Sequence, residues 1–329
     1  MKYDIIFSIP IHEKLEVVID QIVNFFYFNP NSAIVYHISQ GFNYSGSGLT
    51  KERFLSIIKQ IGNVYINPMS VRTGRDDIIQ AHLSNFKFAN DNLDFGYFCL
   101  CASNELFLKN GLSKYIEPFD CGLEFLNVLS SENREWVAGL KAQKDPDLKN
   151  YLMKNGGVGI WGSHVEGSFY KKELFVDIVN EIESFYDYQL MPFAYPRDEI
   201  YFSTVVSAMK EAGRVLRIKE NGLFSWSRWH SFMDLKVWAC DVKRLQNKAE
   251  VYSLKRVDRD INANLRMYMR KHLGYADELR KYVPEAIERS DISMYIEDAL
   301  DYCVEFCRML YRRIRRVYWR YSDKFAHSA

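Results

Sequence analysis

Three short apolar runs, separated by segments with helical spacing, constrain the fold of this chain more than any other feature. Residues 3–11 (YDIIFSIPI), 33–38 (AIVYHI) and 97–101 (YFCLC) read as buried strands. Strands this uniformly apolar are typical of a parallel sheet that is covered by helices on both faces. The segments 15–28 and 78–88 have the apolar spacing of such helices. The sequence therefore predicts an α/β fold with a mostly parallel sheet.

The ends of these strands are where a ligand is expected. Parallel sheets bind ligands beyond the carboxyl ends of their strands. The candidates at this edge are Pro10 and His37 for a nucleotide, and Asn104 and Glu105 for the lining of the same cleft. Arg75 is a further candidate for contact with the nucleotide, and a plain turn at this position is the alternative. The phosphate-cradling motifs GxGxxG and GxxxxGK[ST] are both missing, so neither a dinucleotide fold nor a P-loop is supported.

Composition excludes several classes of protein. Apolar residues make up 48% and charged residues 26%, the balance of a soluble globular protein, and the formal net charge of +1 gives no case for nucleic acid. Aromatic residues reach 15%, which suits the stacking of rings on sugars. The chain shows neither a signal-peptide pattern nor a run of 18 apolar residues, so we expect a cytoplasmic protein. Its six cysteines form no CxxC pair, which indicates reduced thiols.

The segment Tyr195-Pro196-Arg197-Asp198-Glu199 is the leading candidate for catalysis. It places two adjacent carboxylates at the start of a helix expected over 199–212. Acidic residues at a helix start also serve as caps and interact favourably with the helix dipole. Local sequence alone leaves the two interpretations open.

Several blocks resemble the core-2/I-branching β-1,6-N-acetylglucosaminyltransferases and their bacterial relatives. The segment YPRDEIYFSTV is similar to the family's S-P-D-E-x-x-x-x-T, with Arg197 inserted before the acid pair. Further similar blocks follow in family order: AIVYHIS, SVRTGRDDIIQAHLSNF, YFCLCASNELFL, GSHVEGSFYKKELF and VYSLKRVDRD. Together they cover roughly residues 1–260.

The resemblance implies a GT-A type fold and an inverting glycosyl transfer without a metal ion or other cofactor. Glu199 would then be the catalytic base. Cations would neutralise the leaving diphosphate: Lys255 by resemblance, together with Arg228 or Lys236, all three of which also read as ordinary surface cations. Asp145-Pro146-Asp147 and Asp258-Arg259-Asp260 fit the metal-binding pattern D-x-D, but neither follows an expected sheet strand.

Other residues suit the binding of a saccharide acceptor. Glu166 lies in a loop flanked by glycine, between expected strands within 158–170. Trp226 stands near the family's acceptor-stacking tryptophan, although a plain core position explains it as well. His12 and His37 have no Cys or carboxylate at ligand spacing, so a zinc site is disfavoured.

The end of the chain is basic and amphipathic. Residues 291–325 read as one long helix or two, with an apolar stripe at 296, 300, 303, 307, 310, 314 and 317 and many arginines beyond 307. Such a helix suits the surface of an anionic membrane. The alternative is a stripe packed on the catalytic domain, with a solvated basic face.

These observations predict a GT-A-like domain over 1–250 and a helical extension over 251–329. The predicted function is transfer of a hexosyl or N-acetylhexosaminyl group from a nucleotide sugar, UDP-GlcNAc in the first instance, to a saccharide or lipid-linked acceptor. Without a leader or anchor, the resemblance points to bacterial capsule or lipopolysaccharide assembly on the inner face of the cytoplasmic membrane. The alternative is a non-catalytic scaffold that keeps the nucleotide-sugar fold.

Overall fold

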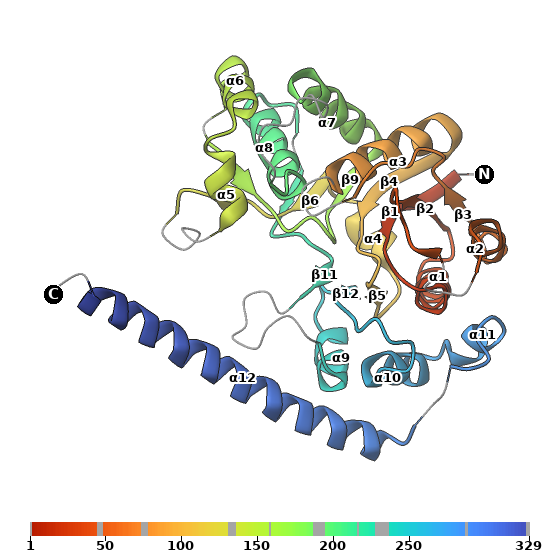
Figure 1. Ribbon diagram of the computed structural model, residues 1–329. Coiled ribbons are helices and arrows are strands. Elements are labelled where there is room, and N and C mark those ends of the chain that lie inside the picture. The colour runs from red at the N-terminus through yellow and green to blue at the C-terminus, as the bar shows by residue number, and fades with distance from the viewer. Residues whose placement is uncertain are drawn as a thin grey trace.

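The computed structural model of the chain describes residues 2–44, 49–73, 78–130, 136–157, 159–186, 195–215, 217–227, 237–286 and 289–326, with the side chains of 309, 312–313 and 316–326 excepted. Within these ranges the protein is a mixed α/β structure built around one large sheet (Figure 1).

In the described part of the chain, seven strands form the central sheet in the order β10-β6-β9-β4-β1-β2-β3. Neighbouring strands run parallel except on the two sides of β9, which is antiparallel to both β4 and β6. The expected mostly parallel α/β sheet is thus confirmed. The strands are β1 Lys2–Ile11, β2 Ser32–Ile38, β3 Val64–Ile66, β4 Asp94–Leu100, β6 Cys121–Leu123, β9 Phe169–Lys171 and β10 Ile218–Glu220.

Strand β1 is central and buried on both faces, which explains its uninterrupted apolar run. Phe7 and Ile9 point into a core shared with α1 (Leu15–Phe28) and α2 (Lys51–Ile58). Ile6 points into the opposite core, which is shared with α3 (Ile78–Asn92), α7 (Lys172–Phe185) and α8 (Asp198–Glu211). Helices therefore cover both faces, as the strand composition predicts.

Two smaller sheets and three short helices accompany the central sheet in the described part of the chain. A second sheet has the order β11-β12-β5, formed by β5 Leu106–Phe107, β11 Ser225–Trp226 and β12 Ser253–Leu254. A third pairs β7 Leu126–Asn127 with β8 Trp161–Gly162. Short helices α4 (Leu112–Ile116), α5 (Val137–Ala142) and α6 (Pro146–Asn155) complete this half of the chain.

The helix expected over 199–212 begins one residue earlier, at Asp198 of α8. The described part of residues 215–240 contains the strands β10 and β11 and the start of α9 (Ala239–Gln246). Asp145 of the first D-x-D match caps α6, because its Oδ1 accepts hydrogen bonds from the amides of Asp147 and Leu148 at 3.0 and 3.2 Å. Its other oxygen accepts from Tyr195 and Tyr201, so this carboxylate is structural.

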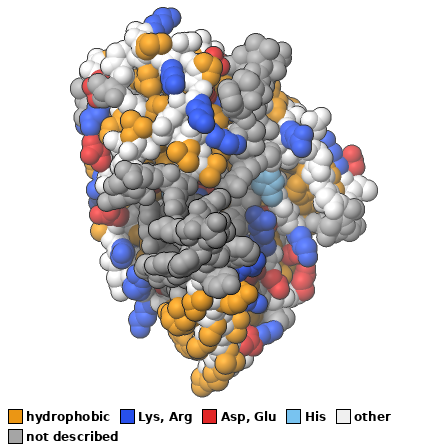
Figure 2. Space-filling view, turned by 60° about the vertical axis from the view of Figure 1, so that its left-hand side comes forward, with side chains coloured by type: hydrophobic (Ala, Val, Ile, Leu, Met, Phe, Trp, Pro, Cys, Tyr) orange, Lys and Arg blue, Asp and Glu red, His pale blue; other side chains and the backbone are white. Residues whose placement is uncertain are grey.

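The chain ends in helices: α10 Asn264–Leu273, α11 Ala276–Arg280 and the long α12 Asp291–Ala326. Helix α12 packs on α9 and α10 with its first half and then runs on past α9 (Figure 1). Figure 2 shows apolar side chains gathered at the lower edge of the molecule, where α12 lies. Within the described ranges, no helix has the length and apolar character needed to cross a bilayer.

Candidate active site

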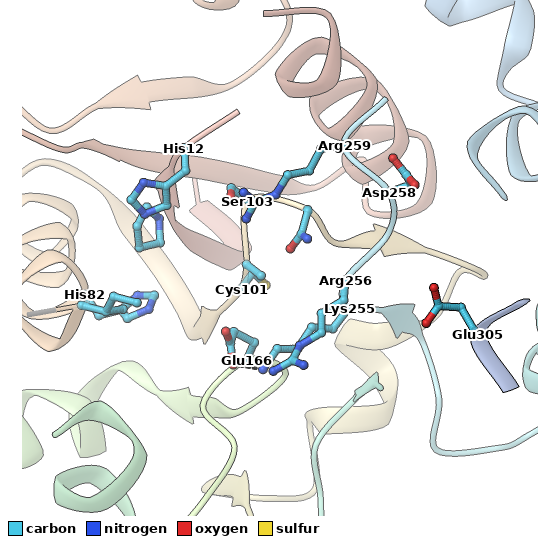
Figure 3. A pocket seen from close by; sticks show the side chains of 14 residues that line it. His12, His82, Cys101, Ser103, Glu166, Lys255, Arg256, Asp258, Arg259 and Glu305 are labelled. Atoms are coloured by element: carbon cyan, nitrogen blue, oxygen red, sulfur yellow. Dashed lines mark hydrogen bonds and ion pairs between the residues drawn. The ribbon is translucent and has the colours of Figure 1, made fainter. Parts of the chain in front are cut away.

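A cavity of about 610 Å³ opens at the carboxyl ends of β1 and β4 (Figure 3). The chain continues from β1 to β2 on one side of the sheet, and β4 lies on the other side. The β1–β4 boundary is therefore a topological switch point, the place where open α/β sheets bind their ligands. Pro10 and His12 line the cavity from the end of β1, and Ala102, Ser103 and Asn104 line it from the end of β4.

Cations from one segment face this cavity. Lys255, Arg256 and Arg259 follow β12 and also line this cavity, with Arg259 beside Ser103 (Figure 3). Arg256 has a left-handed backbone, with φ of 65°, which is uncommon for a side chain other than glycine. The turn at Arg256 directly follows Lys255, and both side chains line the same cavity. Three cations within five residues suit a polyanionic ligand.

Buried interactions hold the cationic segment in place. Arg266 of α10 donates from Nη1 to the Asp20 carboxylate of α1 at 2.5 Å, and both side chains are fully buried. The same guanidinium donates from Nε to the carbonyl of Asp258 at 2.5 Å. On the cavity side, Glu13 pairs with Arg259 at 3.1 Å. The position of the segment 255–259 thus depends on α1 and α10 together.

Glu166 and Lys255 form an ion pair between two cavities. Lys255 Nζ donates to Glu166 Oε2, and both residues line the first cavity and a second one of about 460 Å³. Burial alone would raise the pKa of Glu166, but the charge and hydrogen bond of Lys255 outweigh it and lower that pKa to about 2. Glu166 is therefore a carboxylate at every physiological pH.

The second cavity has features suited to a sugar. Trp226 of β11 is half-buried on its wall, with the Arg244 guanidinium 5.4 Å from the ring centroid. His164 donates its amide to Glu124 Oε2 at 3.1 Å, and both residues line the cavity. An aromatic ring beside carboxylates is the combination that binds a pyranose through its C–H face and its hydroxyls.

Glu199 lies at the start of α8 and is not in the lining of either cavity. Its Oε2 accepts a hydrogen bond from Trp136 Nε1 at 3.0 Å, and its carbonyl accepts from the Ser163 amide at 2.8 Å. Asp198 is buried. Burial, and then the charges of Glu199 and Glu166, raise the Asp198 pKa well above its usual value. The three carboxylates therefore interact electrostatically.

Two other buried groups have shifted pKa values. Burial raises the pKa of Glu105 to about 7, although Ser253 Oγ donates to its carboxylate at 2.5 Å and the Ala102 amide at 3.0 Å. Burial lowers the pKa of His82, in the first cavity, to about 4, and its Nδ1 shares a hydrogen bond of 2.8 Å with Ser8. Glu105 braces the loop after β4, and His82 is neutral at pH 7.

The structure places five of the residues singled out from the sequence in the linings of the two cavities. Pro10, Asn104, Glu166, Trp226 and Lys255 each line one of the two cavities or both. Glu105 and His37 are buried instead; His37 Nε2 accepts from the Val71 amide at 3.2 Å, so its ring supports the segment after β3. Arg75, Arg228 and Lys236 lie outside the described residues.

Sequence reasoning missed Arg256, Arg259, His82 and Glu124 as lining residues. The clustering of Lys255, Arg256 and Arg259 in the sequence was a usable signal for two of them. The sequence carried no such signal for His82 and Glu124, because their positions in the cavity linings depend on contacts across the sheet. Among the residues that the structure describes, no three His, Cys, Asp or Glu side chains cluster so as to hold a metal ion.

No protein-family model matches the chain, and no curated protein has a sequence similar enough to match it.

Proposed function

We propose that the protein is an inverting glycosyltransferase that uses a nucleotide sugar, UDP-linked in the first instance, and transfers its hexosyl or N-acetylhexosaminyl group to a saccharide acceptor. The observation that carries the proposal is the cavity at the β1–β4 switch point, faced by three cations from the segment 255–259. A nucleoside diphosphate has a flat base and two negative charges. A cavity at this place in the sheet, lined by cations, suits both. The order of sequence blocks resembling the core-2/I-branching transferases, and the GT-A type fold expected from it, support the same proposal.

In this proposal each of the two cavities binds a different substrate. The first, with its cations, takes the donor diphosphate. The second, with Trp226 and Glu124, takes the acceptor sugar. Lys255 and Glu166 stand where the two meet, which is where a sugar would pass from one ligand to the other.

The reaction then needs two groups. A carboxylate takes the proton of the acceptor hydroxyl while that oxygen attacks the anomeric carbon from the face opposite the diphosphate. The bond from the anomeric carbon to the diphosphate oxygen breaks, and the nucleoside diphosphate leaves with the electron pair. Lys255, with Arg256 and Arg259, stabilises the charge that develops on it, so the proposal requires no metal ion.

We assign the base to Glu199 and an acceptor-hydroxyl contact to Glu166. Trp136 orients the Glu199 carboxylate, and the Ser163 amide ties the start of α8 to the strand that leads to Glu166. A specific observation also favours Glu166 as the base, because its carboxylate, unlike that of Glu199, lines both cavities. The variants Glu199→Gln and Glu166→Gln decide between them. The residue whose loss lowers kcat by a factor of roughly 100 or more is the base.

The function itself is tested with purified protein and a panel of nucleotide sugars. A ligand bound by the folded state raises the unfolding temperature, so the true donor gives the largest shift. Release of nucleoside diphosphate with an acceptor present, retained in EDTA, supports the proposal. A protein that is stabilised by no nucleotide sugar and turns none over contradicts it. Stabilisation without turnover, unaffected by Glu199→Gln and Glu166→Gln, favours the non-catalytic scaffold.

A further inference from the structure

Helix α12 leaves its apolar face exposed along the side chains that the structure describes. Six of the seven stripe positions are described, and all six side chains are exposed: Ile296, Leu300, Cys303, Cys307, Leu310 and Ile314. Leu300 and Ile314 expose 64% and 67% of their surface. In an amphipathic helix of a globular protein this face is normally the one that packs on the core.

The opposite face of α12 makes the contacts with the body. Met294 is 1% exposed, and the Asp298 carboxylate accepts hydrogen bonds from the Ala239 amide at 3.1 Å and from Asn264 at 3.2 Å. The Tyr302 ring meets that of Trp238 edge to face, with centroids 5.5 Å apart. At 100° per residue these positions lie across the helix from the stripe. The sequence-based alternative, a stripe packed on the catalytic domain, is therefore not what the described residues show.

Residues beside the stripe widen it. Val304, Phe306 and Tyr311 flank it and are also exposed, at 47%, 42% and 65%. A two-helix coiled coil places complementary charges at such flanking positions, and here they are apolar. A broad apolar face with aromatic edges is instead the pattern of a helix that lies in a membrane interface.

The charges of α12 also favour a membrane surface as its partner. From residue 306 to 326 the sequence has seven Arg or Lys, at 308, 312, 313, 315, 316, 320 and 324, against one acid, Asp323. Asp298 is directed to the body, and Glu305 lines the first cavity and pairs with Arg308 of the same helix. They are thus poorly placed to neutralise a second copy of the basic half. An anionic phospholipid surface complements the basic half directly.

We propose that α12 docks the protein on an anionic phospholipid surface, with the apolar stripe immersed in the interface and the basic half in contact with the head groups. This docking does not depend on the proposed reaction. It has a consequence for it, because Glu305 lines the first cavity from the other side of α12. A bilayer on the stripe would lie about one helix diameter, roughly 10 Å, from that cavity. An acceptor held in the bilayer is then within reach.

Co-sedimentation of the full-length protein with lipid vesicles tests the proposal. We expect binding to vesicles that contain phosphatidylglycerol, much weaker binding to pure phosphatidylcholine, and weakening as NaCl rises from about 0.1 to about 0.5 M. The double variant Leu300→Glu/Ile314→Glu should lower the partition constant by roughly tenfold or more, because it puts two charges into the stripe. The control is Met153→Glu on α6, a side chain 76% exposed, which should leave binding unchanged.

Two outcomes overturn the proposal. One is wild-type protein that stays in solution with phosphatidylglycerol vesicles, or that binds them equally well as the double variant. The other is a stable dimer, seen by light scattering, that the double variant converts to a monomer while vesicle binding is absent; the stripe then joins two copies of the chain. Matching circular dichroism and unfolding temperatures establish that the variants are folded, as expected for exposed positions.

Discussion

Lys255 and Glu166 form an ion pair, and both residues line the first cavity as well as the second. The pair comes from distant parts of the chain: Glu166 from the loop before β9, Lys255 from the turn after β12. A phosphate group in the first cavity would compete with Glu166 for the same ammonium. Binding of the donor and the ionisation of Glu166 are therefore coupled through Lys255.

Replacing Lys255 by Ala should weaken the binding of a nucleoside diphosphate about tenfold to hundredfold, since a hydrogen bond to a charged group contributes about 1.5–3 kcal/mol. Isothermal calorimetry with UDP measures the change. The control is Lys210→Ala, which removes an exposed ion pair with Glu220 and should leave affinity within error. Equal affinities for Lys255→Ala and wild type would remove Lys255 from the donor site.

Glu166 should make the free energy of unfolding depend on acid pH. Its folded-state pKa, about 2, lies below the ordinary value of 4.5, so its ionised form stabilises the fold above pH 4.5. That stability is lost as the pH falls from 4.5 towards 2, because the unfolded chain binds the proton first. Urea unfolding from pH 6 to 3 should show a shallower loss for Glu166→Gln than for wild type. The exposed Glu220→Gln should follow wild type; a Glu166→Gln curve parallel to wild type would contradict the assignment.

Glu105 should act in the opposite sense. Its folded-state pKa is raised from 4.5 to about 7, so between these values the folded state binds more protons than the unfolded state. Stability attributable to this group therefore falls as the pH rises from 4.5 to 7. Glu105→Gln, which stays neutral and keeps an acceptor for Ser253, should flatten that part of the profile. An unchanged slope between pH 5 and 7 in the same unfolding experiment would show that Glu105 is ionised in the fold.

Gly167 should be required for the position of Glu166. It has φ of 93°, and a Cβ there would lie 2.6 Å from the Ser225 amide nitrogen. Gly213 has φ of 70° with nothing near its Cβ, so it is a matched control for backbone strain alone. We expect Gly213→Ala to cost about 1 kcal/mol and Gly167→Ala about 1–3 kcal/mol more, from overpacking. Chemical denaturation measures both, and similar losses would contradict the close approach of β11.

Asp20 should matter far from the cavities. Asp20→Ala leaves the fully buried Arg266 guanidinium without its counter-charge, which typically costs 3–5 kcal/mol. Since Arg266 also binds the Asp258 carbonyl, UDP affinity should fall along with stability. Disruption of the exposed pair of Lys210 and Glu220 should cost no more than about 1 kcal/mol. Loss of stability with intact UDP binding at low temperature would separate the buried pair from the site.

Local sequence determined the framework of the fold. The apolar runs at 3–11, 33–38 and 97–101 correspond to β1, β2 and β4, because strands buried on both faces need apolar side chains at every position. The same pattern placed Pro10 and Asn104 at the carboxyl edge of the sheet, where they line the first cavity. Helix α12 and its apolar stripe were also readable, because amphipathic spacing is a property of neighbouring residues.

Tertiary structure alone decided what these elements face. Arg259 and His82 reach the first cavity only because chain segments far apart in sequence meet at the β1–β4 switch point. Glu105, which the sequence placed in the cleft, is buried instead. It accepts a hydrogen bond from Ser253, 148 residues away. The direction of the α12 stripe depends on Asp298 and Tyr302, which fix the opposite face to the body. Such contacts are set by packing between distant segments, and no local pattern specifies them.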